Sequence, residues 1–251
     1  MTDPKPLPVF LTGASRGIGA ATARHFAGKG HPLALVARGA EATEQLAREI
    51  NAAGGNAVAI PCDVGDAKSV AQAVARAVKE LGGIGIVINN AGTIEPIAAI
   101  VDADPDAWSR AIDVNLSGPI YVMHHAVPHL PRGGVVINIT SGAAEHPGYG
   151  RSAYCASKAG LMIATRILAV EEGEKRGITV IGFSPGLVDT DMLAFNRANR
   201  MGNAGNVNVA EIRPPAEVAR IIDYLCSAAA ADLSGTIVSA RDPVLRQRAG
   251  V

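Results

Sequence analysis

Short, continuously apolar runs alternate with longer amphipathic segments along most of the chain. Residues 9–11, 33–36 and 57–60 contain only apolar side chains, whereas 41–53 has helical spacing, with Leu46 and Ile50 four residues apart. Uninterrupted apolar runs are typical of strands that are buried on both faces of a parallel sheet. The sequence therefore predicts an α/β fold, a doubly wound parallel sheet of about seven strands (a Rossmann fold), in a single domain.

The expected strands lie near 9–11, 33–36, 57–60, 84–88, 135–139, 178–183 and 236–238. The expected helices cover 18–27, 41–53, 68–81, 107–114 with a continuation toward 130, 152–175 and 215–229. Asp66 is a candidate N-cap for the third helix. One domain spans 1–251, with terminal tails at 1–7 and 242–251. The stretch 189–213 is irregular and rich in Asn and Gly, so we expect it to be a mobile loop that closes over the substrate.

The composition argues against several functions. The chain has 23 basic and 23 acidic residues and only 4% aromatic residues, which gives no support to nucleic-acid binding. No run approaches the length of a membrane span, and the N-terminus does not resemble a signal peptide. The three cysteines, Cys62, Cys155 and Cys226, are far apart, and no metal-ligand spacing is present. We therefore expect a cytoplasmic protein without a structural metal.

A glycine-rich segment, Thr12-Gly13-Ala14-Ser15-Arg16-Gly17-Ile18-Gly19, follows the first expected strand and opens the first helix. Glycine permits a tight turn and a close approach of the backbone to a ligand. The free N–H groups and the dipole at a helix N-terminus favour a diphosphate. This segment predicts a dinucleotide site, although its G-x-x-x-G-x-G spacing differs from the G-x-G-x-x-G of long-chain dehydrogenases.

The glycine-rich segment and four further motifs together make the chain resemble the short-chain dehydrogenase/reductase family, from about residue 8 to 240. The motifs are the glycine turn, Asn89-Asn90-Ala91-Gly92, Asn115, Ser141 with Tyr154-x-x-x-Lys158, and Pro185-Gly186-x-Val188-x-Thr190. The resemblance implies an NADP(H) cofactor held by Gly13, Ser15, Arg16, Gly17, Ile18, Gly19, Arg38, Asp63, Val64, Asn90, Ala91, Gly92, Tyr154, Lys158, Pro185, Gly186, Val188 and Thr190. It also implies a homodimer or homotetramer.

Tyr154 and Lys158 are four residues apart on an expected helix and therefore share one face. A nearby ammonium lowers the pKa of a tyrosine, which makes proton transfer to a ketone oxygen feasible. Ser141 can donate a hydrogen bond to the same oxygen. In the family the lysine also holds the nicotinamide ribose, and the asparagine, here Asn115, maintains a proton relay.

The second expected strand ends at Ala37-Arg38, without the acidic residue that favours NAD. Arg38 and Arg16 can instead pair with the 2′-phosphate of NADP, and this favours NADPH. In the family, the residue at Asp63 contacts the adenine ring.

Several segments look most like the sepiapterin reductase and benzil reductase branch, in which Asp242 would anchor a pterin. We also expect Ala143, Tyr149 and Leu187 to face the substrate. The favoured function is reduction of an activated ketone, diketone or pterin side-chain ketone by NADPH. One alternative is a 3-oxoacyl-thioester reductase. Another is a non-catalytic dinucleotide-binding sensor or scaffold, against which the complete Ser141, Tyr154 and Lys158 set argues.

Overall fold

The computed structural model describes residues 6–198 and 209–251, and this part of the chain contains a seven-stranded sheet in which all neighbouring strands are parallel. The strands are β1 Val9–Thr12, β2 Leu33–Ala37, β3 Ala57–Pro61, β4 Ile86–Asn89, β5 Val135–Ile139, β6 Thr179–Ser184 and β7 Ile237–Ser239. Their order is β3-β2-β1-β4-β5-β6-β7. The predicted single-domain, doubly wound fold is confirmed.

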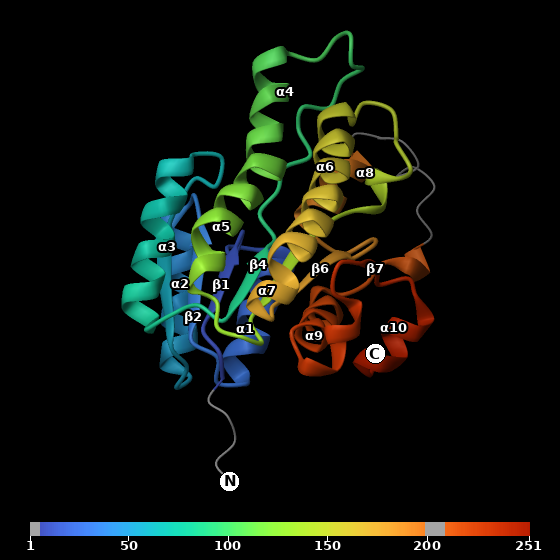
Figure 1. Ribbon diagram of the computed structural model, residues 1–251. Helices are drawn as coiled ribbons and strands as arrows, with labels where there is room; N and C mark the ends of the chain where they lie inside the picture. The colour runs from blue at the N-terminus through green and yellow to red at the C-terminus, as the bar shows by residue number, and fades with distance from the viewer. Residues whose placement is uncertain (1–5, 199–208) are drawn as a thin grey trace.

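Helices cover both faces of the sheet (Figure 1). They are α1 Gly17–Gly28, α2 Ala40–Ala52, α3 Ala67–Leu81, α4 Pro105–Ile112, α5 Gly118–Ala126, α6 Ser152–Leu168, α7 Glu174–Arg176, α8 Asp191–Ala198, α9 Pro215–Leu225 and α10 Pro243–Ala249. The 3-10 and π turns are η1 Asp113–Ser117, η2 Val127–His129, η3 Gly142–Ala144, η4 Ala169–Gly173, η6 Val209–Glu211 and η7 Ala228–Leu233.

Alternate residues of each strand enter two different cores. Val9 and Leu11 of β1 pack in a core with α1, α2, α9 and α10, whereas Phe10 packs on the opposite face with α3 and α5. All three side chains are fully buried. This burial on both faces is the physical reason why the strand sequences are uninterrupted apolar runs.

Two expected helices are interrupted by π turns. The segment predicted at 107–130 consists of α4, η1, α5 and η2 in succession, and the one predicted at 152–175 consists of α6, η4 and α7. The two composite helices lie side by side in Figure 1. A π turn inserts one extra residue into a helix, and such a short interruption is not evident from the apolar pattern of the longer segment. The N-cap prediction for Asp66 is confirmed, since its side chain accepts from the Lys68 N–H.

Two expectations about irregular segments were wrong in part. The stretch 189–213 contains the helix α8, and Thr190 helps to begin it because its Oγ1 accepts from Leu193 N–H at 3.4 Å. Positions 199–208 of the predicted loop, and 1–5 of the N-terminal tail, lie outside the described residues. The predicted tail 242–251 contains α10, which Asp242 caps by accepting from Val244 N–H at 2.8 Å. Both helices are short, so their apolar periodicity is weak.

The stretch Ser152–Arg176 is long and apolar enough to cross a membrane by length and composition alone, with a mean hydropathy of 1.3. This differs from the expectation that no segment reaches such a length. Its inner residues, including Leu161 and Thr165, are fully buried in the protein. A core helix of a soluble protein has the same character.

The chain builds β1, β2 and β3 in one direction across the sheet and then returns to the other side of β1 with β4. At such a switch point the connections after neighbouring strands diverge and leave a crevice at their carboxyl ends. The glycine turn follows β1 and Asn90-Ala91-Gly92 follows β4. The fold therefore brings these two predicted motifs together.

Candidate active site

The glycine turn after β1 is bonded directly to the end of β4. Asn90 Nδ2 donates to the carbonyl oxygens of Thr12 and Gly13, both at 3.0 Å. Thr12 Oγ1 accepts from the N–H groups of Asn90 and Ala91, at 3.0 and 3.1 Å. The Asn90 side chain thus holds the shape of the turn.

Glycine is required at Gly13, Gly17 and Gly19 for different reasons. Gly13 and Gly17 have positive φ angles of 65° and 53°, which side chains rarely adopt. A Cβ on Gly19 would lie 2.0 Å from the Gly13 carbonyl oxygen. Arg16, the N-cap residue of α1, forms no side-chain cap bond with the described residues. The first-turn N–H groups of α1 can therefore serve a ligand, as a diphosphate would require.

Tyr154 and Lys158 lie near the start of α6, and both side chains are buried. Lys158 Nζ lies 5.8 Å from the centroid of the Tyr154 ring and donates to the Ile139 carbonyl at the end of β5, at 2.8 Å. Burial lowers the pKa of Lys158 from 10.5 to about 8. The lysine is therefore mostly an ammonium at pH 7.

The pKa of Tyr154 differs from the expectation. Burial raises it, and this effect exceeds the opposing effects of hydrogen bonding to Ser141 and of the Arg151 charge. The predicted net lowering of this pKa is therefore wrong, because desolvation disfavours the tyrosinate. Tyr154 consequently retains its proton at neutral pH. Ser141 follows β5, and its Oγ also accepts from Ala143 N–H at 3.2 Å.

Asn115 is fully buried in the π turn η1. Its Oδ1 accepts from Thr93 N–H and its Nδ2 donates to the Thr93 carbonyl, both at 2.8 Å. A Cβ built on Gly92 would lie 3.2 Å from Asn115 Oδ1 and 3.8 Å from Lys158 Nζ. Gly92 therefore leaves the space in which the asparagine and the lysine approach each other. Asn115 and Lys158 thus lie on the same side of the Gly92 backbone, and the proton relay expected of Asn115 stays a prediction.

The segment after β6 reaches the glycine turn. Thr190 Cγ2 lies 3.1 Å from the Cβ position of Gly17, and Arg16 pairs with Asp191 at 3.2 Å. Val188 is buried in the core that contains α1, so only its backbone is available to a ligand. Pro185 is buried as well, and Gly186 has a positive φ of 72°.

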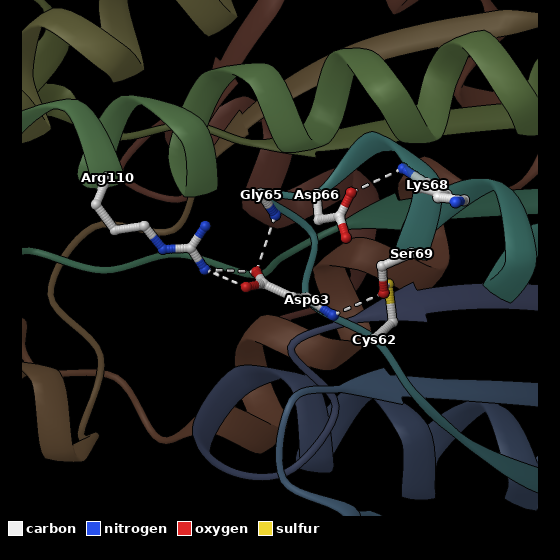
Figure 2. Close-up of polar contacts among 7 residues, drawn as sticks. All are labelled: Cys62, Asp63, Gly65, Asp66, Lys68, Ser69 and Arg110. Carbon is white, nitrogen blue, oxygen red and sulfur yellow. Dashed lines mark hydrogen bonds and ion pairs between the residues drawn. The ribbon is translucent and has the colours of Figure 1, made fainter.

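The adenosine end of the predicted site contains an arginine that sequence analysis missed. Arg110 of α4 pairs with both carboxylate oxygens of Asp63, which follows β3 (Figure 2). Asp63 Oδ1 also accepts from Gly65 N–H at 3.0 Å. Burial alone would raise the pKa of Asp63, but hydrogen bonds from Arg110 and Gly65 and the charges of Arg110 and Arg38 lower it. No sequence pattern connects the two partners, which are separated by 47 residues.

A small apolar cluster surrounds the catalytic tyrosine. Ala143 and Ile94 pack with Tyr154, and the partly buried side chains of Ile97, Cys155 and Met192 adjoin them. Of the predicted substrate residues, the structure places Ala143 beside the tyrosine and Leu187 half-buried after β6. Tyr149 is exposed, and the Asp242 carboxylate is used in capping α10. Sequence analysis missed Ile94 and Met192.

An open groove of about 920 Å³ adjoins the glycine turn. Its lining includes Ser15, Arg16 and Gly17 of the turn, Thr190, and Glu49 of α2. Tyr154 does not line this groove. Within 6–198 and 209–251, no three His, Cys, Asp or Glu side chains are grouped as metal ligands.

Comparison with known proteins agrees with this geometry. Residues 8–201 match the family model described as short chain dehydrogenase. A cis-4-hydroxycyclohexanecarboxylate dehydrogenase of Sinomonas cyclohexanicum is 35% identical over 232 residues, covering 91% of this chain and 92% of that protein. A versicolorin reductase of Emericella nidulans is 34% identical over 244 residues, covering 91% and 92%.

Among solved structures, a short chain dehydrogenase from Burkholderia cenocepacia in complex with NADP superimposes with a TM-score of 0.85. It is 31% identical, and the match covers 93% of this chain and 95% of that one. The sequence match, the superposition and the arrangement of Ser141, Tyr154 and Lys158 agree. The chain belongs to the short-chain dehydrogenase family and is an oxidoreductase of that family.

Proposed function

We propose that the protein reduces a carbonyl group to an alcohol with NADPH as the cofactor. The observation that carries this proposal is the meeting of three elements around Tyr154. Helix α6 supplies Tyr154 and Lys158, the end of β5 supplies Ser141, and η1 supplies Asn115. A pure dinucleotide-binding sensor or scaffold needs neither a proton donor such as Tyr154 nor a carbonyl-orienting hydroxyl such as Ser141.

The residues present fit a nicotinamide dinucleotide. Glycine at Gly13 and Gly19 lets the turn pack closely on Asn90 and on itself, because a Cβ at either position would clash, and the N-terminus of α1 adjoins this turn. The Burkholderia relative binds NADP. Ala37 stands where an acidic residue would favour NAD, and Arg38 follows it. NADPH, when bound, supplies the hydride.

The chain's own residues supply the proton and orient the carbonyl. Tyr154, whose pKa is raised by burial, is protonated at neutral pH and donates to the carbonyl oxygen. Ser141 donates a hydrogen bond to the same oxygen. Lys158, as an ammonium beside Gly92, holds the nicotinamide ribose and favours the tyrosinate that remains after proton transfer.

The apolar side chains of Ile94, Ala143 and Met192 favour a ketone with an apolar or cyclic substituent. Among the relatives, a cyclohexane-ring alcohol dehydrogenase and a versicolorin reductase are consistent with such substrates. The narrower sepiapterin and benzil reductase assignment depends on sequence segments alone. The expectation that Asp242 anchors a pterin was one argument for that assignment, and the use of its carboxylate as a helix cap removes this argument.

We further propose that the protein is a cytoplasmic homodimer or homotetramer. Ile163, Ile167 and Val170 lie on one outer face of the α6–η4 helix, and Ile163 is 52% exposed. Ile120 of α5 is exposed as well. Exposed apolar side chains on two neighbouring helices favour self-association. The three cysteines are free thiols, as in a reducing compartment.

The test is oxidation of NADPH and of NADH against a panel of carbonyl compounds. The panel contains benzil, sepiapterin, a substituted cyclohexanone and an acetoacetyl thioester. Turnover of ketones with NADPH supports the proposal, and preference for the thioester would favour the 3-oxoacyl-thioester reductase. Absence of turnover throughout the panel, together with tight NADPH binding, would favour the sensor or scaffold.

A further inference from the structure

The pair formed by Asp63 and Arg110 has no evident role in the stability of the fold. The two side chains are 38% and 40% exposed, and ion pairs that are this exposed contribute little to folding. Yet Arg110 spans the space between α4 and the end of β3 and meets both oxygens of the carboxylate. Its position therefore needs another explanation.

The surroundings are shaped to admit this guanidinium. A Cβ on Gly65 would lie 2.3 Å from Arg110 Nη1, so glycine at this position leaves the space that the arginine occupies. Figure 2 shows Arg110 reaching across to Asp63 while Gly65 donates to the same carboxylate. The groups drawn there come from the β3–α3 connection, from the first turn of α3 and from α4.

Arg38 lies at the same edge of the sheet. Ala37 of β2 pairs with Pro61 of β3, and the Cys62 N–H donates to the Ala37 carbonyl at 2.9 Å. Arg38 directly follows Ala37, and Asp63 directly follows Cys62. Arg38 is exposed and forms no ion pair within the described ranges 6–198 and 209–251. With Arg16, it is one of the two arginines that the sequence analysis expects to pair with the 2′-phosphate of NADPH.

We propose that Arg110 is a positioning residue for cofactor selectivity: it neutralises Asp63 and thereby keeps Arg38 available to the 2′-phosphate of NADPH. Without Arg110, the Asp63 carboxylate would attract Arg38 and repel the phosphate. Both effects weaken NADPH binding. Neither effect weakens the binding of NADH, because NADH has no 2′-phosphate. This inference rests on the proposed NADPH dependence.

The experiment measures the dissociation constants of NADPH and NADH by quenching of protein fluorescence, without turnover. Arg110→Gln removes the cation and retains hydrogen-bonding groups. We expect it to weaken NADPH binding about five- to tenfold, which is part of the strength of one charge-assisted contact, and NADH binding by no more than about twofold. The double variant Asp63→Asn with Arg110→Gln removes both charges and should restore the NADPH-to-NADH ratio to within about twofold of the original.

Arg76→Gln is the matched control. Arg76 of α3 pairs with Glu80 at 2.6 Å, and the two side chains are 45% and 39% exposed, so this variant loses a comparable pair outside the site. It should leave the ratio unchanged. High salt should reduce the effect of Arg110→Gln, because the effect is electrostatic.

The inference is overturned if Arg110→Gln leaves the NADPH-to-NADH ratio unchanged, if it weakens the binding of both cofactors equally, or if adding Asp63→Asn to Arg110→Gln does not restore the ratio. If the unaltered protein itself binds both cofactors equally, the proposed NADPH dependence fails instead, and the two failures are therefore distinguishable.

Discussion

The unfolding free energy of the original protein should depend on pH differently from that of the Lys158→Met variant. The difference between the two proteins measures the titration of the buried lysine. Burial lowers the pKa of this lysine from 10.5 to about 8. Between these values the unfolded chain binds a proton that the folded protein does not, so the folded state gains stability as pH rises from 8 to 10.5. Each pH unit corresponds to about 1.4 kcal/mol, and the whole interval therefore to about 3 kcal/mol.

The variant also loses the hydrogen bond to the Ile139 carbonyl and changes packing, but neither effect depends on pH. The difference in unfolding free energy between the original protein and Lys158→Met thus contains a constant part and a titrating part. The original protein should gain about 3 kcal/mol relative to the variant between pH 7.5 and 10.5. Activity should be lost at every pH, because the ammonium that assists Tyr154 is absent.

Urea denaturation followed by far-ultraviolet circular dichroism, at several pH values for both proteins, measures this difference. Other groups titrate in both proteins and cancel in the subtraction. A difference that stays constant with pH would refute the reasoning, because it would mean that Lys158 titrates alike in the folded and unfolded chains. A difference that falls as pH rises would mean that folding raises the pKa of Lys158 instead of lowering it.

Four further predictions concern the site, the turn, the C-terminal helix and the oligomer. Tyr154→Phe should lower kcat by about 10²-fold or more, with NADPH affinity nearly unchanged in a fluorescence titration. Gly19→Ala should destabilise the protein by about 1–3 kcal/mol and weaken NADPH binding because its Cβ meets the Gly13 carbonyl, whereas Gly28→Ala, with no atom within 4 Å, should be neutral or slightly stabilising in thermal melts. Asp242→Ala should cost about 1 kcal/mol of stability by removing the α10 cap, and a changed KM for every ketone tested would contradict this structural role. Ile163→Glu should shift the protein toward the monomer in sedimentation velocity, and an original protein that is already monomeric would refute the proposed interface.

The sequence by itself predicted the sheet and the chemistry at its centre. The patterns that carried these predictions are local, because they depend on periodicity and on allowed φ angles. They are the apolar runs of strands buried on both faces, the glycines of a strand–helix turn, and a tyrosine four residues before a lysine. Tyr154 and Lys158 share a face of α6 wherever that helix is placed. Right-handed crossovers between parallel strands limit the possible strand orders, but the observed order comes from the structure.

The tertiary structure decided the partners of the charged residues. Arg110 is 47 residues from Asp63, and Arg16 is 175 residues from Asp191. Neither pair has a spacing that a sequence pattern can reveal, because each is formed only when separate elements meet at the carboxyl edge of the sheet. The pKa of Tyr154 is a tertiary property for the same reason. The motif places a lysine beside the tyrosine, but the packing around Tyr154 determines how much water it loses. This desolvation outweighs the hydrogen bond to Ser141 and the charge of Arg151.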